Sequence, residues 1–173
     1  MIVVADTGPL LALAKIGALE LLRELYQPVI TGPAVYTEAV TAGLAMNATD
    51  ALILNEAYQR GELVVRRPGA TQLAHSGSLH AGEVESIQLA LKLPADWLLI
   101  DDFDARQLAQ QHLTLAGLTV GLKGTLGILV TATQAQIVTP AQAIDLVKAL
   151  KSRPDIWLSS DLCEAVIKTL QRL

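Results

Sequence analysis

Residues 2–10 read Ile-Val-Val-Ala-Asp-Thr-Gly-Pro-Leu and indicate the fold class more clearly than any other stretch. The apolar, β-branched run at residues 2–5 predicts a short buried strand that ends at Asp6. Thr7-Gly8 predicts a turn, and Pro9 suits the first turn of a helix because the amide hydrogen that proline lacks has no partner there. The stretch therefore predicts a strand, a turn and a helix, with a carboxylate at the turn.

The same alternation of short apolar runs and helical periodicity continues along the chain. We expect further strands at residues 29–30, 63–65, 97–100 and 118–120. We expect helices at residues 10–26, 50–58, 82–93 and 104–113, and from residues 33, 125 and 140 onward. This order predicts a three-layer α/β fold in which helices cover both faces of a central parallel sheet of about four to five strands.

The dipeptide Arg153-Pro154 is the best candidate for a late linker. It separates a main domain, residues 1–153, from residues 154–173, which we interpret as a helical appendage of the same domain that begins with a Ser or Asp cap. Residues 68–78 are rich in Gly, Ser and Thr, so we expect a mobile loop there.

Composition limits the class of protein. Of the 173 residues, 51% are hydrophobic and 17% are charged, a balance expected when strands are buried on both faces and a partner covers some helix surface. We therefore expect a homodimer or a higher oligomer. The net charge of -4 argues against an extended basic surface for nucleic acid, but it allows a nuclease whose acids surround a divalent cation.

Cysteine usage and hydropathy indicate the compartment. Cys163 is the single cysteine, so neither an internal disulfide nor a zinc site is predicted, and we expect a reducing, cytoplasmic setting. No apolar run approaches the roughly 20 residues that a membrane helix needs. The start of the chain also lacks the basic segment of a secretion signal, so we expect a soluble protein with no membrane contact.

Carboxylates follow two of the expected strands. Asp6 ends the first strand, and Asp101 and Asp102 follow the strand at residues 97–100. Ligands of open α/β sheets bind beyond the carboxyl ends of the strands, so these acids are candidate site residues. Asp101, Asp102 or Asp104 would serve equally well as a cap of the following helix.

Helical spacing places two more acids. Glu38 shares a helix face with apolar residues that include Ala42, and Glu83 shares one with Ile87, so both faces should pack on the sheet. An acid at the start of such a buried stripe is directed toward the edge of the sheet. Glu85 lies on another face of its helix and should point to water, so Glu83 is the preferred candidate.

Acids gathered in one place need compensating charge. Two carboxylates 4 Å apart repel by about 4 kcal/mol at an effective dielectric near 20. No Cys or His cluster accompanies these positions, so a hard cation bound through oxygen atoms is the simplest solution, and Mg²⁺ or Mn²⁺ fits best. Such an ion assists hydrolysis of phosphodiesters.

Candidate substrate contacts lie near a later helix start, Gly124-Thr125. Lys123 and Thr125 are placed to meet a phosphate there, although the glycine would also be explained by close helix packing. Arg66-Arg67 and Arg106 are candidates for an RNA groove. Scattered surface cations explain them equally well, and the sequence interleaves no aromatic residues with them to stack bases.

Several of these motifs occur together, in the order seen in PIN domains. They are the segments 3–10, 33–38, 82–87, 98–102 and 124–127. The chain resembles that family, and more narrowly a prokaryotic branch, long labelled as of unknown function, that is similar to VapC toxins. The likeness covers most of residues 1–150 and also the segment 157–159.

The resemblance implies a PIN-like fold and an endoribonuclease that hydrolyses RNA with Mg²⁺ or Mn²⁺. Carried over by position, the catalytic residues are Asp6, Glu38, Glu83, Asp101 and Asp102, and the metal ligands are the same acids without Glu38. The family pattern departs at Glu83, where many VapC proteins have the shorter Asp, and the ligand among the late acids is left open.

Two further implications concern neighbours of the site. The resemblance implies that Thr7 contacts substrate or supports a ligand, that the protein dimerises, and that a toxin of this kind has an antitoxin that inserts a segment into the site. The alternative is a catalytically silent PIN-like module that binds protein or nucleic acid, with the apolar surface and the C-terminal tail as its interface.

Overall fold

The computed structural model describes residues 1–69, 73, 77 and 79–173. Its five strands form one parallel sheet in the order β3-β2-β1-β4-β5, which confirms the predicted α/β fold. The strands are β1 (Val3–Ala5), β2 (Val29–Thr31), β3 (Leu63–Val65), β4 (Trp97–Leu99) and β5 (Gly121–Lys123). Most of the expected loop at residues 68–78 lies outside the described residues.

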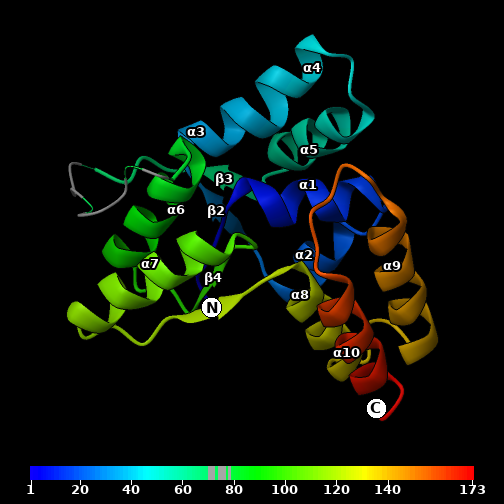
Figure 1. Cartoon of the computed structure of the whole chain (residues 1–173). Helices are drawn as coiled ribbons and strands as arrows, with labels where there is room; N and C mark the ends of the chain where they lie inside the picture. The colour runs from blue at the N-terminus through cyan, green and yellow to red at the C-terminus, as the bar shows by residue number, and fades with distance from the viewer. Residues whose placement is uncertain (70–72, 74–76, 78) are drawn as a thin grey trace.

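Helices alternate with the strands along the chain (Figure 1). Those before β4 are α1 (Thr7–Lys15), α2 (Glu20–Leu25), α3 (Pro33–Tyr36), the π-helix η1 (Thr37–Ala42), α4 (Gly43–Ala45), α5 (Thr49–Gln59) and α6 (Ala81–Lys92). Those after it are α7 (Phe103–Leu115), α8 (Thr125–Gln134), α9 (Pro140–Ser152) and α10 (Ser160–Leu170). No helix in the described ranges is long and apolar enough to cross a membrane.

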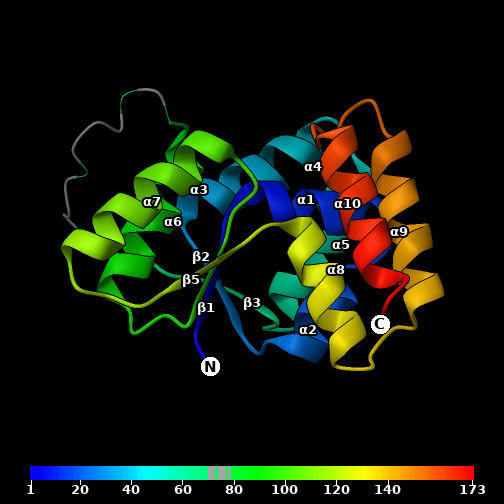
Figure 2. The same ribbon diagram turned by 60° about the horizontal axis from the view of Figure 1, so that its bottom comes forward.

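The sheet is buried on both faces because successive side chains of a strand point to opposite sides. Val3, Ala5 and Leu99 pack into a core with α1, α2, α5, α8, α9 and α10. Val4 and Leu98 pack into a second core with α6 and α7. Figure 2 shows these two groups of helices on either side of the strands.

The chain changes direction across the sheet at β1. From β1 it adds β2 and β3 on one side and then crosses back to β4 on the other. The carboxyl ends of β1 and β4 therefore flank the crevice where ligands of open α/β sheets bind. The amide of Asp6 donates to the carbonyl of Leu99 at 2.9 Å, which fixes the first acid at this edge.

The helix predicted over residues 10–26 is divided into α1 and α2. The break lies at Gly17, whose φ of 67° is left-handed and favours glycine. The amides of Gly17 and Ala18 donate to the carbonyls of Ala14 and Leu13, as expected where a helix ends in a left-handed residue. The apolar spacing continues across the break, so periodicity alone did not reveal it.

The last strand begins three residues later than predicted, at Gly121 instead of Leu118. Gly121 pairs with Trp97, and a Cβ at position 121 would clash with the Trp97 ring. A glycine is therefore required where the indole covers the neighbouring strand, and that local fit decides which residues pair.

The C-terminal segment is part of the main core. α10 packs against α8 and α9, and Cys163 and Leu170 are fully buried in the larger core. The predicted boundary at residue 153 marks a turn of the chain between α9 and α10. α10 therefore shares the core of the helices that precede it.

Candidate functional site

A cavity of about 1060 Å³ opens at the carboxyl edge of the sheet, close to the upper end of the size range of ligand sites. All five acids that the sequence singled out line it, from four different helices or their caps. They are Asp6, Glu38, Glu83, Asp101 and Asp102. The fold therefore brings together side chains that lie up to 96 positions apart in the sequence, since 102 minus 6 is 96.

Asp6 is the most deeply placed of these acids, with 5% of its surface exposed. It is the N-cap of α1, and its Oδ2 accepts from the amide of Gly8 at 3.4 Å. Among the buried side-chain atoms of the described residues, Asp6 Oδ1 has no hydrogen-bond partner. Burial raises the pKa of Asp6 to about 7; amide hydrogen bonds oppose this, and repulsion from Glu83 and Glu38 adds to it.

Glu38 is exposed but held by two donors. Thr7 Oγ1 donates to its Oε2 at 2.7 Å, and the amide of Gly82 donates to its Oε1 at 3.2 Å. The predicted buried face of its helix, with Ala34, Val35 and Ala42, is confirmed at Val35, which is fully buried, and wrong at Ala42, which is exposed. Residues 37–42 form a π-helix, whose wider turn shifts the i+4 position away from the sheet, and such turns are frequent at functional sites.

Gly82 leaves room for three of these oxygen atoms. A Cβ at this position would lie 2.8 Å from Glu38 Oε2, 3.1 Å from Thr7 Oγ1 and 3.2 Å from Asp6 Oδ1. Since real Cβ atoms rarely approach other atoms so closely, any side chain here would crowd the acids. The glycine at the first turn of α6 therefore keeps open the space in which Asp6 and Glu38 converge.

Glu83 and Glu85, both on α6, have different roles. Glu83 is 9% exposed and faces the cavity, where its Oε2 accepts from the amide of His80 at 2.8 Å. Burial, with Asp102 and Glu38 nearby, raises its pKa. The prediction that Glu85 points to water is wrong: its Oε2 accepts from the amide of Ala34 at 2.6 Å and so caps α3.

Asp101 is bound at both carboxylate oxygens. Oδ1 accepts from the amide of Thr125 at 2.7 Å, and Oδ2 accepts from the hydroxyl of Thr125 at 2.5 Å. Burial raises the pKa of Asp101, while Thr125 and Arg106 oppose that shift. Thr125 is fully buried, so it positions Asp101 and does not face the cavity as the predicted substrate contact would.

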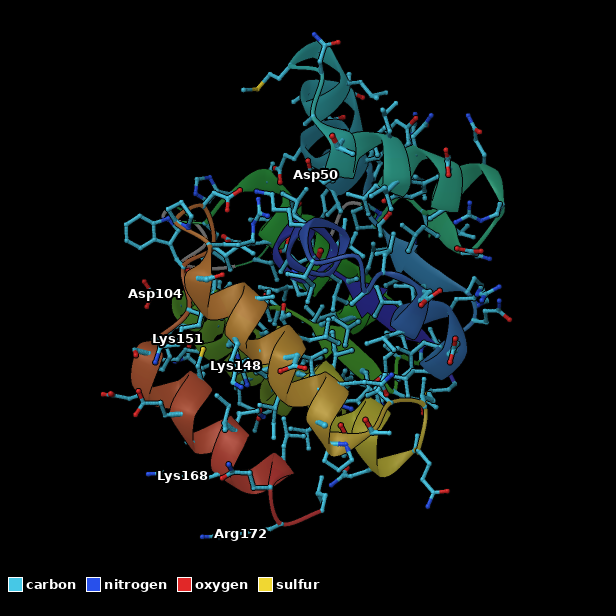
Figure 3. All side chains as sticks on the ribbon, turned by 90° about the vertical axis from the view of Figure 1, so that its right-hand side faces the viewer. Asp50, Asp104, Lys148, Lys151, Lys168 and Arg172 are labelled. Carbon is cyan, nitrogen blue, oxygen red and sulfur yellow. The ribbon has the colours of Figure 1, made fainter. Side chains whose placement is uncertain are left out.

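Asp102 has the capping role that the sequence left open. Its Oδ1 accepts from the amide of Ala105 at 2.8 Å, which caps α7, while the residue itself lines the cavity. Asp104 lies in the first turn of α7, is exposed, and does not line the cavity. Figure 3 shows it at the edge of the molecule. The structure thus separates Asp104 from the other acids.

Helix N-termini offset part of the repulsion between the acids. Each of the five carboxylates accepts a hydrogen bond from the cap or first turn of α1, α6, α7 or α8. These ends carry partial positive charge, which stabilises anions. The compensation is incomplete at Asp6, where one buried oxygen has no donor among the described residues.

The donor set has the chemistry of a hard-cation site. Carboxylate oxygens are the ligands that Mg²⁺ and Mn²⁺ prefer, and Asp6 Oδ1 is a buried oxygen without a partner in the described residues. Across residues 1–69, 73, 77 and 79–173, no three His, Cys, Asp or Glu side chains stand close enough together to enclose an ion. The geometry suits an ion bound through one or two carboxylates and water, as Mg²⁺ commonly is.

The predicted cations divide between the cavity and other parts of the surface. Arg106 lines the cavity, and its Nη1 would lie 3.2 Å from a Cβ at Gly124, beside Asp101. Lys123 does not: its ammonium donates to Tyr26 and Thr131 and lies 3.8 Å from the centre of the Trp97 ring. The side chain of Lys123 is thus held away from the acids by an aromatic and hydroxyl pocket.

Two aromatic residues at the cavity were missed in the sequence. Trp157 is 96% exposed and Phe103 is 70% exposed, and both line the cavity with the acids. Phe103 lies three residues before the candidate cation Arg106, so the expectation that no aromatic residue accompanies the basic residues is wrong there. The position of Phe103 directly after Asp102 was the available signal, and only the fold could reveal Trp157.

Comparison with known proteins gives one match. The family model described as DUF3368, PIN domain, matches residues 2–172. No curated protein and no solved structure matches the chain. The match spans the acids, the cavity and α10 alike.

Proposed function

The chain belongs to the PIN-domain family described as DUF3368, and on this premise we propose that it is a metal-dependent endoribonuclease that hydrolyses RNA phosphodiester bonds. The observation that carries the proposal is the convergence of five acids in one cavity around Asp6, whose Oδ1 is buried without a partner in the described residues. Leaving a buried carboxylate oxygen unsatisfied costs free energy. A cation that binds there recovers this cost.

The proposed metal-site residues are Asp6, Glu83, Asp101 and Asp102, of which one or two would bind the ion directly and the others through water. Bound Mg²⁺ or Mn²⁺ would supply positive charge that stabilises the reacting phosphate. Thr125 holds both oxygens of Asp101, and such supporting hydrogen bonds orient ligating carboxylates. Asp6 carries a proton up to about pH 7 when no cation is present, so it must release that proton when a cation binds.

Glu38 and Arg106 have different proposed roles. Glu38, held by Thr7 and Gly82, presents a carboxylate beside Asp6 and is the acid best placed to orient water for attack. The backbone amide of Arg106 donates to the carbonyl of Asp102 within α7, and its charge acts on Asp101, but its guanidinium forms no hydrogen bond or ion pair with any described residue. Its guanidinium is therefore free to bind a phosphate oxygen of the substrate, for which its planar array of donors is suited.

We also propose that the protein is the toxin of a toxin–antitoxin pair and works in the cytoplasm as a homodimer or higher oligomer. The likeness of its motifs to VapC toxins supports the first part, and the apolar composition supports the second. An antitoxin segment that enters the cavity would meet the acids with a cationic side chain, because opposite charge is needed there.

A silent PIN-like binding module is the second candidate. One observation favours it: each cavity carboxylate already accepts a hydrogen bond from a helix end, and no three acids are assembled to enclose an ion in the described part of the chain. Such a module would bind RNA or protein at the same cavity without hydrolysis.

RNA cleavage by the parent protein and by Asp6→Asn separates the two functions. The nuclease is expected to cleave RNA with Mg²⁺ or Mn²⁺, to stop when the metal is chelated, and to lose at least about 100-fold in rate on Asp6→Asn. Asp104→Asn is the matched control, since Asp104 is exposed and outside the cavity. Equal rates for Asp6→Asn and the parent, both folded by thermal melting, would contradict the proposal.

A further inference from the structure

The cavity has an exposed aromatic residue on each side of its acids. Phe103 is the first residue of α7, on the side of the sheet covered by α6 and α7. Trp157 lies in the strap, which we define as residues 153–159 between α9 and α10, on the other side. Figures 1 and 2 show α7 and the helices that flank the strap on opposite sides of the sheet.

The strap holds Trp157 outward by fixing its neighbours. Ile156 and Leu158 are half-buried and pack against the larger core. Trp157 between them is 96% exposed. Burial alternates along residues 156–158, so anchoring the two neighbours directs the indole away from the protein. Its exposure follows from packing.

One ion pair and one hydrogen bond join the strap to α1, the helix that begins beside Asp6. Asp155 accepts from Lys15 Nζ at 2.8 Å and from Arg153 Nε at 2.9 Å. Arg153 also donates to the main-chain carbonyl of Lys15 at 3.4 Å. Since one helix carries both the acid and the attachment of the strap, the indole keeps a fixed position relative to the acids.

The charge of the cavity limits how it can bind a nucleic acid. It is lined by six acids, which are the five described above and Asp155, against Arg106 and Lys15, and Lys15 is paired with Asp155. Phosphate contacts alone therefore supply little affinity. Stacking of bases on aromatic rings does not depend on net charge and contributes about 1–3 kcal/mol per base.

We propose that Trp157 and Phe103 form a nucleobase-binding subsite, in which unstacked bases on the two sides of the reacting phosphate lie against the two rings. The inference rests on the proposed function, because it assumes that the nucleic acid enters the acid-lined cavity. A duplex would not bind this way, since its bases are already stacked on one another. The subsite thus selects substrates with exposed bases and leaves the acids to act on the phosphate between them.

Tryptophan fluorescence reports the contact directly. Trp97→Phe leaves Trp157 as the single tryptophan, because the chain has two, and Trp97 does not line the cavity. The variant is combined with Asp6→Asn to keep the RNA intact, and is titrated with an unstructured RNA of about eight nucleotides. The single strand is expected to quench the emission. An abasic strand with the same phosphates and a duplex of the same sequence are expected to leave it unchanged.

Affinity variants test the same contact without a fluorophore. In the Asp6→Asn background, Trp157→Ala should weaken binding of the single strand by about 5- to 150-fold, the equivalent of one stacked base. Trp157→Phe, which keeps a ring, should stay close to the parent. Leu115→Ala removes an apolar side chain that is 84% exposed outside the cavity, and it should have no effect.

The other possible results either contradict the proposed subsite or distinguish its failure from failure of the proposed nuclease activity. No quenching, equal quenching by the abasic strand, or unchanged affinity of Trp157→Ala would overturn it. A change of mass in light scattering for Trp157→Ala, with RNA binding intact, would also overturn it and make the indole a protein contact. Cleavage by the parent without quenching contradicts the subsite alone, whereas quenching without cleavage supports the subsite and contradicts the nuclease.

Discussion

The ends of β1 and β4 look alike in sequence and differ in the folded protein. The strands are neighbours, with Ala5 opposite Leu99, and an aspartate follows each at the edge of the sheet. Asp101 has both oxygens occupied by Thr125. Asp6 has one oxygen without a partner in the described residues. One strand end is satisfied within the described residues, and the other leaves a buried oxygen without a partner there.

This difference predicts that Asp6 and Asp101, at the ends of neighbouring strands, contribute differently to stability and to function. A satisfied carboxylate contributes to folding through the helix that it caps, and its removal leaves donors without acceptors. An unsatisfied buried carboxylate opposes folding, because burial disfavours its charged form. We therefore expect Asp6 to contribute to ligand binding and not to stability, and Asp101 to contribute to both. Proteins commonly accept such local costs at functional sites.

The largest effect is expected when each aspartate is replaced by alanine. Asp6→Ala should lose at least about 100-fold in metal-dependent RNA cleavage with little net change in unfolding free energy, because loss of the α1 cap is offset by removal of a buried, unsatisfied carboxylate. Asp101→Ala should lose about 1–3 kcal/mol of unfolding free energy, because the amide and hydroxyl of Thr125 lose their acceptor. Cleavage rates and urea unfolding of both variants measure this contrast. Equal loss of stability in the two variants would contradict the predicted contrast.

The pH dependence of stability should come next in size. Burial raises the pKa of Asp6 from 3.8 to about 7, so between these values the folded metal-free protein holds a proton that the unfolded chain has released. Unfolding then releases a proton. The free energy of unfolding should therefore fall as pH rises from about 4 to 7, by up to about 1.4 kcal/mol per pH unit from this group, and level off above.

Urea unfolding in a chelator between pH 5 and 8 measures that slope. Asp6→Asn removes the titrating group and should show a flatter profile than the parent. Asp104→Asn, an exposed acid outside the cavity, should keep the slope of the parent. If Asp6→Asn and the parent changed with pH in parallel, the buried charge at the end of β1 would not have the proposed cost.

Arg106 provides a further test at the end of β4. Its guanidinium lies beside Asp101 and has no hydrogen-bonded or ion-paired partner in the described residues. Arg106→Gln should lower RNA affinity by about 10-fold or more, the strength of a charge-assisted phosphate contact. Arg172→Gln is the control, because Arg172 projects from the C-terminal end outside the cavity (Figure 3). An equal loss in both variants would indicate only a change of net charge.

The smallest effect concerns two glutamates on one helix. Glu83→Gln removes charge from the cavity and should lower cleavage by about tenfold. Glu85→Gln should leave cleavage unchanged, because Glu85 caps α3 and a glutamine oxygen can still accept that hydrogen bond. Initial rates at saturating Mn²⁺ compare the pair. If Glu85→Gln were the more damaging change, the assignment of these two acids would be reversed.

Much of the fold could be predicted because its elements depend on local patterns. Apolar runs that end at Asp6 and before Asp101 identified β1 and β4, and a parallel sheet then requires their acids to meet. The errors occurred where a local contact decided the outcome. Gly17 ended a helix by its left-handed backbone, and Gly121 fixed the last strand by fitting against Trp97.

The site was predictable in its acids and less so in their partners. Strand ends and helix starts indicated Asp6 and Glu83, which the fold brings to one cavity, and their roles there stay a prediction. The π-helix around Glu38 has no signature in residue spacing, because it breaks the period on which such patterns rely. Lys123 was misplaced, and Trp157 was missed, because their contacts are made by residues distant in the sequence.

Calorimetric titration with Mn²⁺ tests the central claim most directly. It compares the parent, Asp6→Asn and Asp104→Asn, each shown to be folded by its thermal melt. We predict that the parent and Asp104→Asn bind the ion with release of protons near neutral pH, and that Asp6→Asn loses this binding. Equal Mn²⁺ binding by Asp6→Asn and the parent would contradict the claim that the open oxygen of Asp6 makes this edge of the sheet a metal site.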